Sequence, residues 1–175
     1  MREIQDLTKD ELLELVTDFA KRWLAHDGLW FQAVEATHGL DEAIRFDMEA
    51  WERFTVVEAG RIRRLLQLPV EAGLDGLDQA LRFRLYAVVN EQEILRPDER
   101  TLIFQMKRCR VQEARERKGM QPFPCKPVGL VEYAGFASAI DPRIRTQVLS
   151  CPPDPHPPEY HCAWRFTLET EGDQR

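Results

Sequence analysis

The residues with the clearest chemical potential are four cysteines, Cys109, Cys125, Cys151 and Cys162. The last two bracket ten residues that include five prolines and two histidines, CPPDPHPPEYHC, a composition that excludes a regular helix or strand. This stretch is compatible with a disulfide loop, a metal site, a redox pair or an inert turn. The N-terminus lacks the apolar run of a secretory signal, so we expect a cytoplasmic protein with reduced thiols, which weakens the disulfide interpretation. The absence of a C-x-x-C pair weakens the redox interpretation.

A metal site suits the expected positions of these cysteines. Cys109 falls between a predicted strand and a predicted helix, Cys125 directly precedes a helix, and Cys151 ends a strand. Cysteines at the ends of elements can converge from distant segments, and the positive end of a helix favours a thiolate. Zinc is held in structural sites by four such ligands. The spacing alone is equally compatible with free cysteines that pack as small apolar side chains.

Two histidines in the same loop, His156 and His161, are alternative ligands or bases. Each could replace a cysteine at a metal, although a proline-rich loop more often exposes them. Cys125 paired with His156 or His161 would instead resemble the nucleophile and base of a hydrolase.

The N-terminal half of the chain is predicted to be helical. Thr8 and Glu11 form a capping box, and apolar residues then recur at helical spacing as far as about 26–28. A second helix is expected over 29–38, ended by Gly39, a third from Asp41 to Pro69, and a short one over 75–81.

The second half alternates between strands and helices. A hairpin is expected from strands over roughly 84–95 and 100–107, followed by helices over 110–118 and 126–140. Strands over 143–150 and 160–168 complete the order β-β-α-α-β-β. This order predicts an α+β fold with an antiparallel sheet. We divide the chain into a helical part over 1–82, an α+β part over 83–169 and a polar tail over 170–175, all within one compact domain.

The C-terminal half resembles the 4-vinyl reductase domain family. The matching features are Cys125 at the head of the helix KPVGLVEYAGFASAI, the strand RIRTQVLS, the pair Cys151 and Cys162, and Trp164 two residues later. In phenol-sensing regulators of that family, three cysteines and a glutamate resemble a zinc site. Val148 stands where the glutamate is expected, so we place Cys109 as the fourth ligand. The resemblance thus implies a zinc site of Cys109, Cys125, Cys151 and Cys162.

The whole chain, including AHDGLWFQAVE and AWERFTVVEA, resembles an uncharacterised prokaryotic family placed near L-2-amino-thiazoline-4-carboxylate hydrolases. Domains similar to the 4-vinyl reductase family are thought to bind small apolar or aromatic molecules between sheet and helices, and often dimerise through helices. The resemblance therefore implies a ligand pocket and a homodimer. The expected lining comprises His26, Trp30, Trp51, Phe54, Glu58 and Tyr86. The alternative is that these aromatic residues form only a packed core.

Composition restricts the partners. The formal net charge is −6 and the isoelectric point is near 5.3, which argues against a nucleic-acid-binding protein. No stretch approaches the roughly 18 apolar residues of a membrane span. We expect a zinc-stabilised domain that binds or senses a small molecule without catalysis. The alternative is a cysteine- or zinc-dependent hydrolase of a small cyclic amide or thiazoline.

Overall fold

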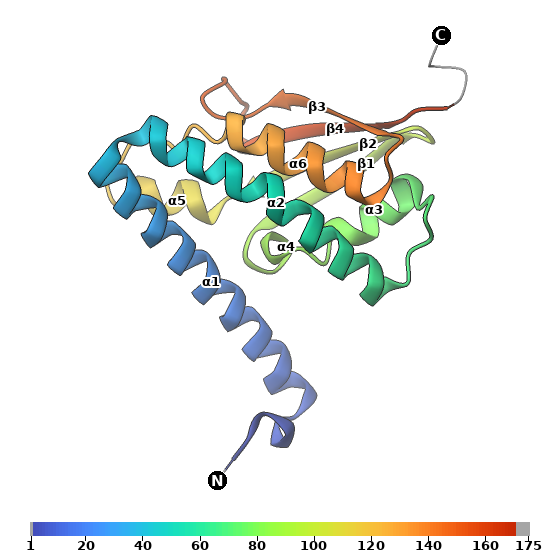
Figure 1. The fold of residues 1–175 in the computed structure, drawn as a ribbon, viewed down its shortest axis with the longest axis horizontal. Helices are drawn as coiled ribbons and strands as arrows, with labels where there is room; N and C mark the ends of the chain where they lie inside the picture. The colour runs from blue at the N-terminus through green and yellow to red at the C-terminus, as the bar shows by residue number, and fades with distance from the viewer. Residues whose placement is uncertain (1, 171–175) are drawn as a thin grey trace.

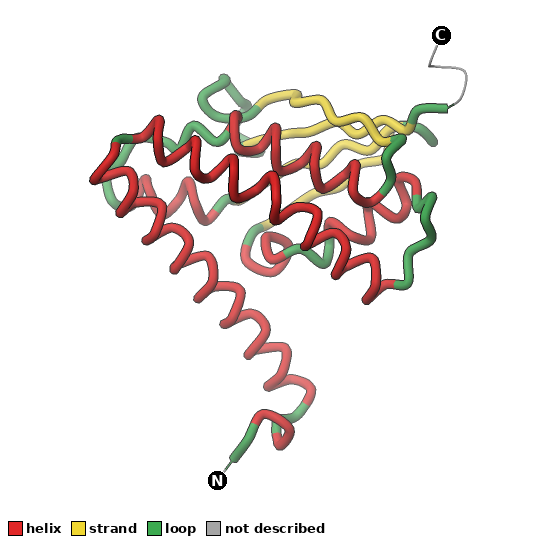
Figure 2. Tube along the Cα trace, in the orientation of Figure 1, coloured by secondary structure: helices red, strands yellow, loops and turns green. Residues whose placement is uncertain are grey.

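The computed structural model describes residues 2–170 and has the expected α+β fold (Figure 1). A four-stranded antiparallel sheet in the order β1-β2-β4-β3 is covered on one face by helices, as Figures 1 and 2 show. Of the expected polar tail over 170–175, the residues after Thr170 lie outside the described range.

The long helix α1 (Lys9–His38) begins at the predicted capping box, in which Thr8 and Glu11 each accept a hydrogen bond from the other's backbone N–H. The prediction of a break near Gly28 was wrong, because the helix continues to His38. One glycine inside a helix costs about 1 kcal/mol, which a long run of helix-forming neighbours can offset. The real end is Gly39, whose φ of +87° lets the chain turn into α2.

The helices α2 (Leu40–Leu66) and α6 (Lys126–Ile140) pack side by side along the sheet (Figure 1). The shorter α3 (Gly73–Leu81) and α5 (Arg110–Arg117) stand near opposite ends of this pair. The N-terminal half of α1 projects away from the sheet and helix layers (Figure 1).

A second correction concerns the residues before the first strand. Residues 84–89 were predicted as part of a strand, but Leu85–Val89 forms the one-turn helix α4, and β1 (Glu91–Asp98) starts only afterwards. Burial of Arg84 against two acidic residues, and of the Tyr86 ring against Trp51, outweighs the strand preference of Val88 and Val89.

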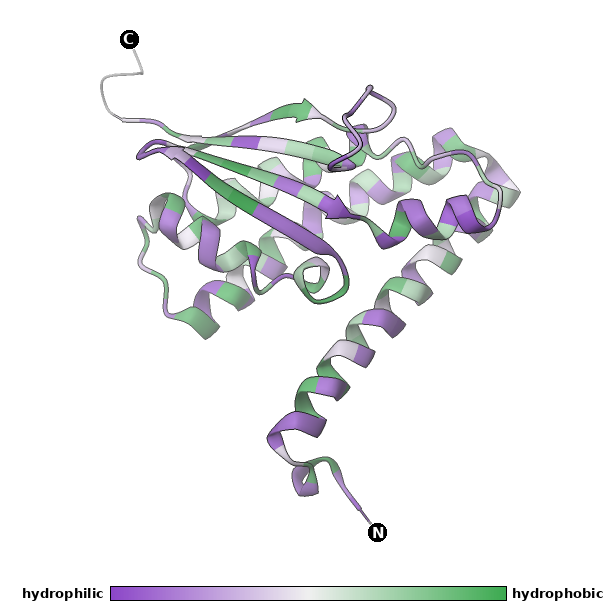
Figure 3. Ribbon diagram, turned by 180° about the vertical axis from the view of Figure 1, so that it is seen from behind, coloured by the Kyte–Doolittle hydropathy of each residue, from purple (hydrophilic) through white to green (hydrophobic). Residues whose placement is uncertain are grey.

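The other strands follow their predicted alternation. In β2 (Thr101–Arg108), every second side chain is buried: Leu102, Phe104 and Met106. They join residues of β4 (Cys162–Leu168) and of α6 in one core, and β3 (Ile144–Ser150) closes the sheet beside β4. Seen from behind, the opposite face of the sheet is not covered by helices and carries mixed hydrophilic and hydrophobic residues (Figure 3). Cys151 and Cys162 stand, as expected, at the two ends of a hairpin loop.

Candidate functional site

The four cysteines share one cavity of about 430 Å³, to which α1, α2, α4, α5, α6 and the sheet contribute. Cys109 is the residue before α5, and Cys125 is the residue before α6. Cys151 directly follows β3 and Cys162 begins β4. Four segments distant in sequence therefore bring their thiols to one enclosure, and within residues 2–170 none of these thiols forms a disulfide.

Backbone hydrogen bonds explain this convergence. The Lys126 amide donates to the Pro152 carbonyl at 2.9 Å, which ties the start of α6 to the loop after Cys151. The His161 amide donates to the Met106 carbonyl at 2.8 Å, which holds the start of β4 against the end of β2. The Lys126 ammonium also pairs with Asp154 at 2.8 Å.

The Gln112 side chain organises the approach to Cys125. Its amide nitrogen donates to the Phe123 carbonyl at 2.8 Å and to the Cys125 sulfur at 3.1 Å. Its amide oxygen accepts from the Phe123 backbone N–H at 2.9 Å. A buried glutamine with these partners fixes both the loop and the direction of the thiol.

The thiols also interact with one another. A hydrogen bond from Cys151, together with the Gln112 amide, lowers the pKa of Cys125. Hydrogen bonds to Cys125 and Cys162, together with burial, raise the pKa of Cys151 well above its ordinary value. Burial raises the pKa of Cys109 to about 12. Of these three thiols, only Cys125 therefore has a pKa shifted towards the thiolate.

The chemistry of this donor set fits zinc, which prefers thiolates. The positions of the side chains are less decisive. Across the described part of the chain, no group of three or more histidine, cysteine, aspartate or glutamate side chains is arranged to hold a metal ion. Cys109 lies near Cys125 and Cys162, and Cys151 lies near the same two thiols. The loop histidines do not line the cavity; their rings lie 5.8 Å apart, centre to centre.

Two of the six expected ligand-binding residues, Trp51 and Tyr86, line the cavity. Their rings are stacked with centroids 6.0 Å apart. Phe54 packs behind Trp51, at 5.5 Å between centroids, and Glu58 pairs with Arg84, so both support the wall without lining it. His26 and Trp30 lie on exposed positions of α1 outside the lining, and the Trp30 side chain is 55% exposed.

Three acidic residues are among the polar residues of the cavity that the sequence interpretation missed. Asp47 on α2 and Glu132 on α6 line it, with Asp27 of α1 at an exposed position. Burial, with repulsion from Asp27 and Glu132, raises the pKa of Asp47 to about 7. Burial also raises the pKa of Glu132 despite its ion pair with Arg84. One signal was available: Glu132 is the only acidic residue in an otherwise largely apolar helix.

A family model described as "Family of unknown function (DUF6125)" matches residues 5–168, almost the whole chain. The chain belongs to this family. The family description assigns no activity, and the resemblance to 4-vinyl reductase domains and thiazoline hydrolases remains a prediction. A comparison with curated proteins found no match. Within the described residues, no helix is both long and apolar enough to cross a membrane.

Proposed function

We propose that this DUF6125 protein is a zinc-stabilised domain that binds or senses a small molecule and is not itself a catalyst. The observation that supports this proposal is one cavity that carries the four cysteines on the same lining as the stacked pair Trp51 and Tyr86. A volume of about 430 Å³ lies in the range of small-molecule sites, which are mostly apolar with a few polar groups.

In this proposal Cys109, Cys125, Cys151 and Cys162 hold the metal. Zinc would supply folding energy by joining two helix starts to a hairpin, and it would relieve the crowding of buried thiols. The Gln112 amide already donates a hydrogen bond to the Cys125 sulfur, and it would stabilise the thiolate there without binding the metal itself. Cytoplasmic residence agrees with four unpaired thiols within one cavity.

The expected homodimer is part of the proposal. The N-terminal half of α1 carries a row of exposed apolar side chains, which could pack against a second copy of the chain. They are Leu12, Leu13, Val16, Phe19 and Trp23. Neither a nucleic acid nor a membrane is proposed as a partner.

The test is the metal content of protein purified without added metal. We expect one zinc per chain, and a strong chelator or Cys151→Ser should lower the melting temperature by about 10 °C or more, because structural zinc contributes directly to folding. His156→Ser and His161→Ser are the matched controls and should retain both zinc and melting temperature. A metal-free sample with four free thiols and an unchanged melting temperature would overturn the zinc assignment.

The lowered pKa of Cys125 favours one second candidate, a hydrolase of a small cyclic amide or thiazoline. The loop histidines that were considered as its base lie outside the cavity lining, which weakens this candidate. X-ray absorption on the same zinc-loaded sample separates the two functions. Four sulfur ligands at about 2.3 Å support a structural metal, whereas three with an oxygen or nitrogen ligand support a catalytic one.

A further inference from the structure

The charged groups at the inner part of the cavity are unevenly balanced. Glu132 is 7% exposed, and Asp47 is half-buried beside it. The cation that pairs with Glu132 is Arg84, which is 2% exposed and lies 2.8 Å from Glu132 and 2.9 Å from Glu58. One guanidinium thus serves two carboxylates, and Asp47 adds a third negative group.

Basic residues also contribute to the lining, but they do not offset this excess. Arg115 is the buried one, and both of its terminal nitrogens donate to the Glu35 carboxylate at 2.9 Å. The rest occupy exposed positions on α1 and α5 or directly after α5; they are Lys21, Arg110, Arg117 and Lys118. The exposed part of the lining is therefore mainly basic, whereas Asp47 and Glu132 lie in its more buried part.

Burying excess carboxylates costs free energy unless they are protonated or paired with a cation. The raised pKa values of Asp47 and Glu132 are the signature of this cost. A positively charged ligand would pair with these carboxylates and remove the free-energy cost of burying them. An aromatic wall beside them would hold such a ligand. Asp47 lies one turn before Trp51 on α2, both line the cavity, and the Trp51 ring stacks on Tyr86, so the acid stands at the edge of an aromatic wall.

Carboxylates beside aromatic faces are a combination that recognises ammonium groups. Within residues 2–170, two other residues of the lining each carry a buried nitrogen without a hydrogen-bond acceptor. The indole nitrogen of Trp164, a residue that is 0% exposed, and the side-chain nitrogen of Asn90 have no hydrogen-bond partner in the described structure. Because both are donors, they suit an acceptor atom elsewhere on the same ligand.

From this arrangement we infer that the cavity binds a small organic amine, whose ammonium group lies between the Asp47 and Glu132 carboxylates and the Trp51–Tyr86 wall. This inference rests on the proposed ligand-binding function and names its ligand class. The apolar body of the amine would occupy the rest of the cavity, whose aromatic lining includes Phe31, Phe123, Tyr133 and Trp164.

The test uses three probes of similar shape and different charge at neutral pH: phenethylamine, 2-phenylethanol and phenylacetate. Each is titrated into the full-length protein by isothermal calorimetry. We expect the amine to bind at least about tenfold more tightly than the alcohol, as for a desolvated cation over an aromatic face, and the carboxylate to bind most weakly. Asp47→Asn should reduce the preference for the amine to under about threefold, because it removes the unpaired carboxylate. Glu52→Gln, an exposed acid on the same helix, is the matched control and should leave the preference unchanged.

Each outcome has a distinct meaning. If the alcohol binds as tightly as the amine, or Asp47→Asn keeps the preference while its melting curve stays cooperative, the amine assignment is wrong and the ligand-binding function stands. If none of the three probes binds, both are wrong. Should Asp47→Asn fail to fold, Asp27→Asn at the exposed edge replaces it, with a smaller loss of preference expected. An unchanged preference in that variant also contradicts the inference.

Discussion

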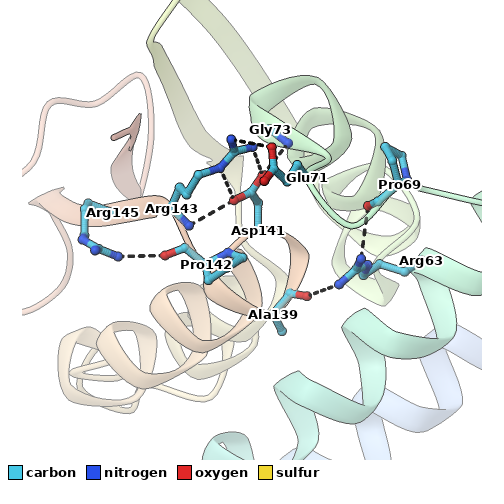
Figure 4. Close-up of polar contacts among 9 residues, drawn as sticks. All are labelled: Arg63, Pro69, Glu71, Gly73, Ala139, Asp141, Pro142, Arg143 and Arg145. Atoms are coloured by element: carbon cyan, nitrogen blue, oxygen red, sulfur yellow. Dashed lines mark hydrogen bonds and ion pairs between the residues drawn. The ribbon is translucent and has the colours of Figure 1, made fainter. Parts of the chain in front are cut away.

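The two ends of the helical layer treat buried carboxylates in opposite ways. Just beyond the C-terminus of α6, Asp141 accepts hydrogen bonds from the Gly73 amide at 2.9 Å and from the Arg143 amide and side chain at 2.8–3.0 Å (Figure 4). Arg63 nearby donates to the carbonyls of Ala139 and Pro69, each at 3.1 Å (Figure 4). This end joins α2, α3, α6 and β3 through well-paired polar groups.

At the cavity end, polar groups are close together but poorly paired. Arg84 Nη2 and Glu132 Oε1 form an ion pair at 2.8 Å. Neither atom makes a hydrogen bond to any group in the part of the chain that the structure describes. Carboxylates with enough donors hold neighbouring elements together. Buried carboxylates with too few donors have a raised pKa and can still bind another cation. The paired groups at the Asp141 end therefore stabilise the fold. At the cavity end, burying underpaired carboxylates costs free energy, which a bound cation would offset.

The largest effect should follow from removing the cation of the cavity end. Arg84→Met leaves Glu58 and Glu132 buried without their partner, so we expect a loss of about 3 to 5 kcal/mol in the free energy of unfolding, measured with urea. The control is Arg82→Met, whose side chain is 60% exposed, and it should change stability by at most about 0.5 kcal/mol.

Adding Glu132→Gln to Arg84→Met sharpens this result. If uncompensated charge causes the loss, the double variant should recover part of it. A double variant no more stable than Arg84→Met would mean that the loss reflects packing of the guanidinium against the surrounding aromatic rings.

A pair of glycine substitutions asks whether the cavity wall is firmly packed. A Cβ atom on Gly129 would lie 2.7 Å from the Trp164 ring, so Gly129→Ala should displace this wall and destabilise the protein by about 1 to 3 kcal/mol. Apart from its two chain neighbours and the backbone of α2 itself, a Cβ on Gly60 meets no atom of the described structure within 4 Å, so Gly60→Ala should stabilise α2 by about 0.5 to 1 kcal/mol. Thermal and urea unfolding measure both changes. Equal effects at the two positions would indicate a loose wall, and the cavity would then be a packing defect.

Sequence reasoning found the parts of the molecule that local patterns control. The alternation in β2, the capping box at Thr8 and the proline start of α6 each depend on nearby residues, and each predicted its element. The places of the four cysteines at element ends allowed them to meet, but the spacing alone was equally compatible with free cysteines, and the set of four came from the family resemblance. The acidic pair Asp47 and Glu132 could not be found in this way, because their proximity depends on how α2 packs against α6.

The same limit explains the error at α4. Val88 and Val89 favour a strand locally, but the burial of Arg84 and Tyr86 is decided by partners more than twenty residues away in sequence. Contacts between residues far apart in sequence therefore governed both the missed element and the missed residues.

The smallest predicted effects test the comparison through pH. Paired donors lower the pKa of Asp141 to about 2, so the stability it contributes is present above about pH 4 and is lost as pH falls through 2. Burial raises the pKa of Asp47 to about 7, so its contribution has the opposite sign: stability present below about pH 4 is lost as pH rises through 7.

Asp141→Asn should therefore cost about 1 to 2 kcal/mol at pH 7 and little near pH 2, a figure discounted because Arg143 is 38% exposed. Asp47→Asn should instead gain about 1 to 2 kcal/mol at pH 8 and little at pH 4. Urea unfolding across this pH range measures both variants against the unsubstituted protein. If the two variants shift stability in the same direction with pH, the contrast between a locked end and an underpaired end is wrong.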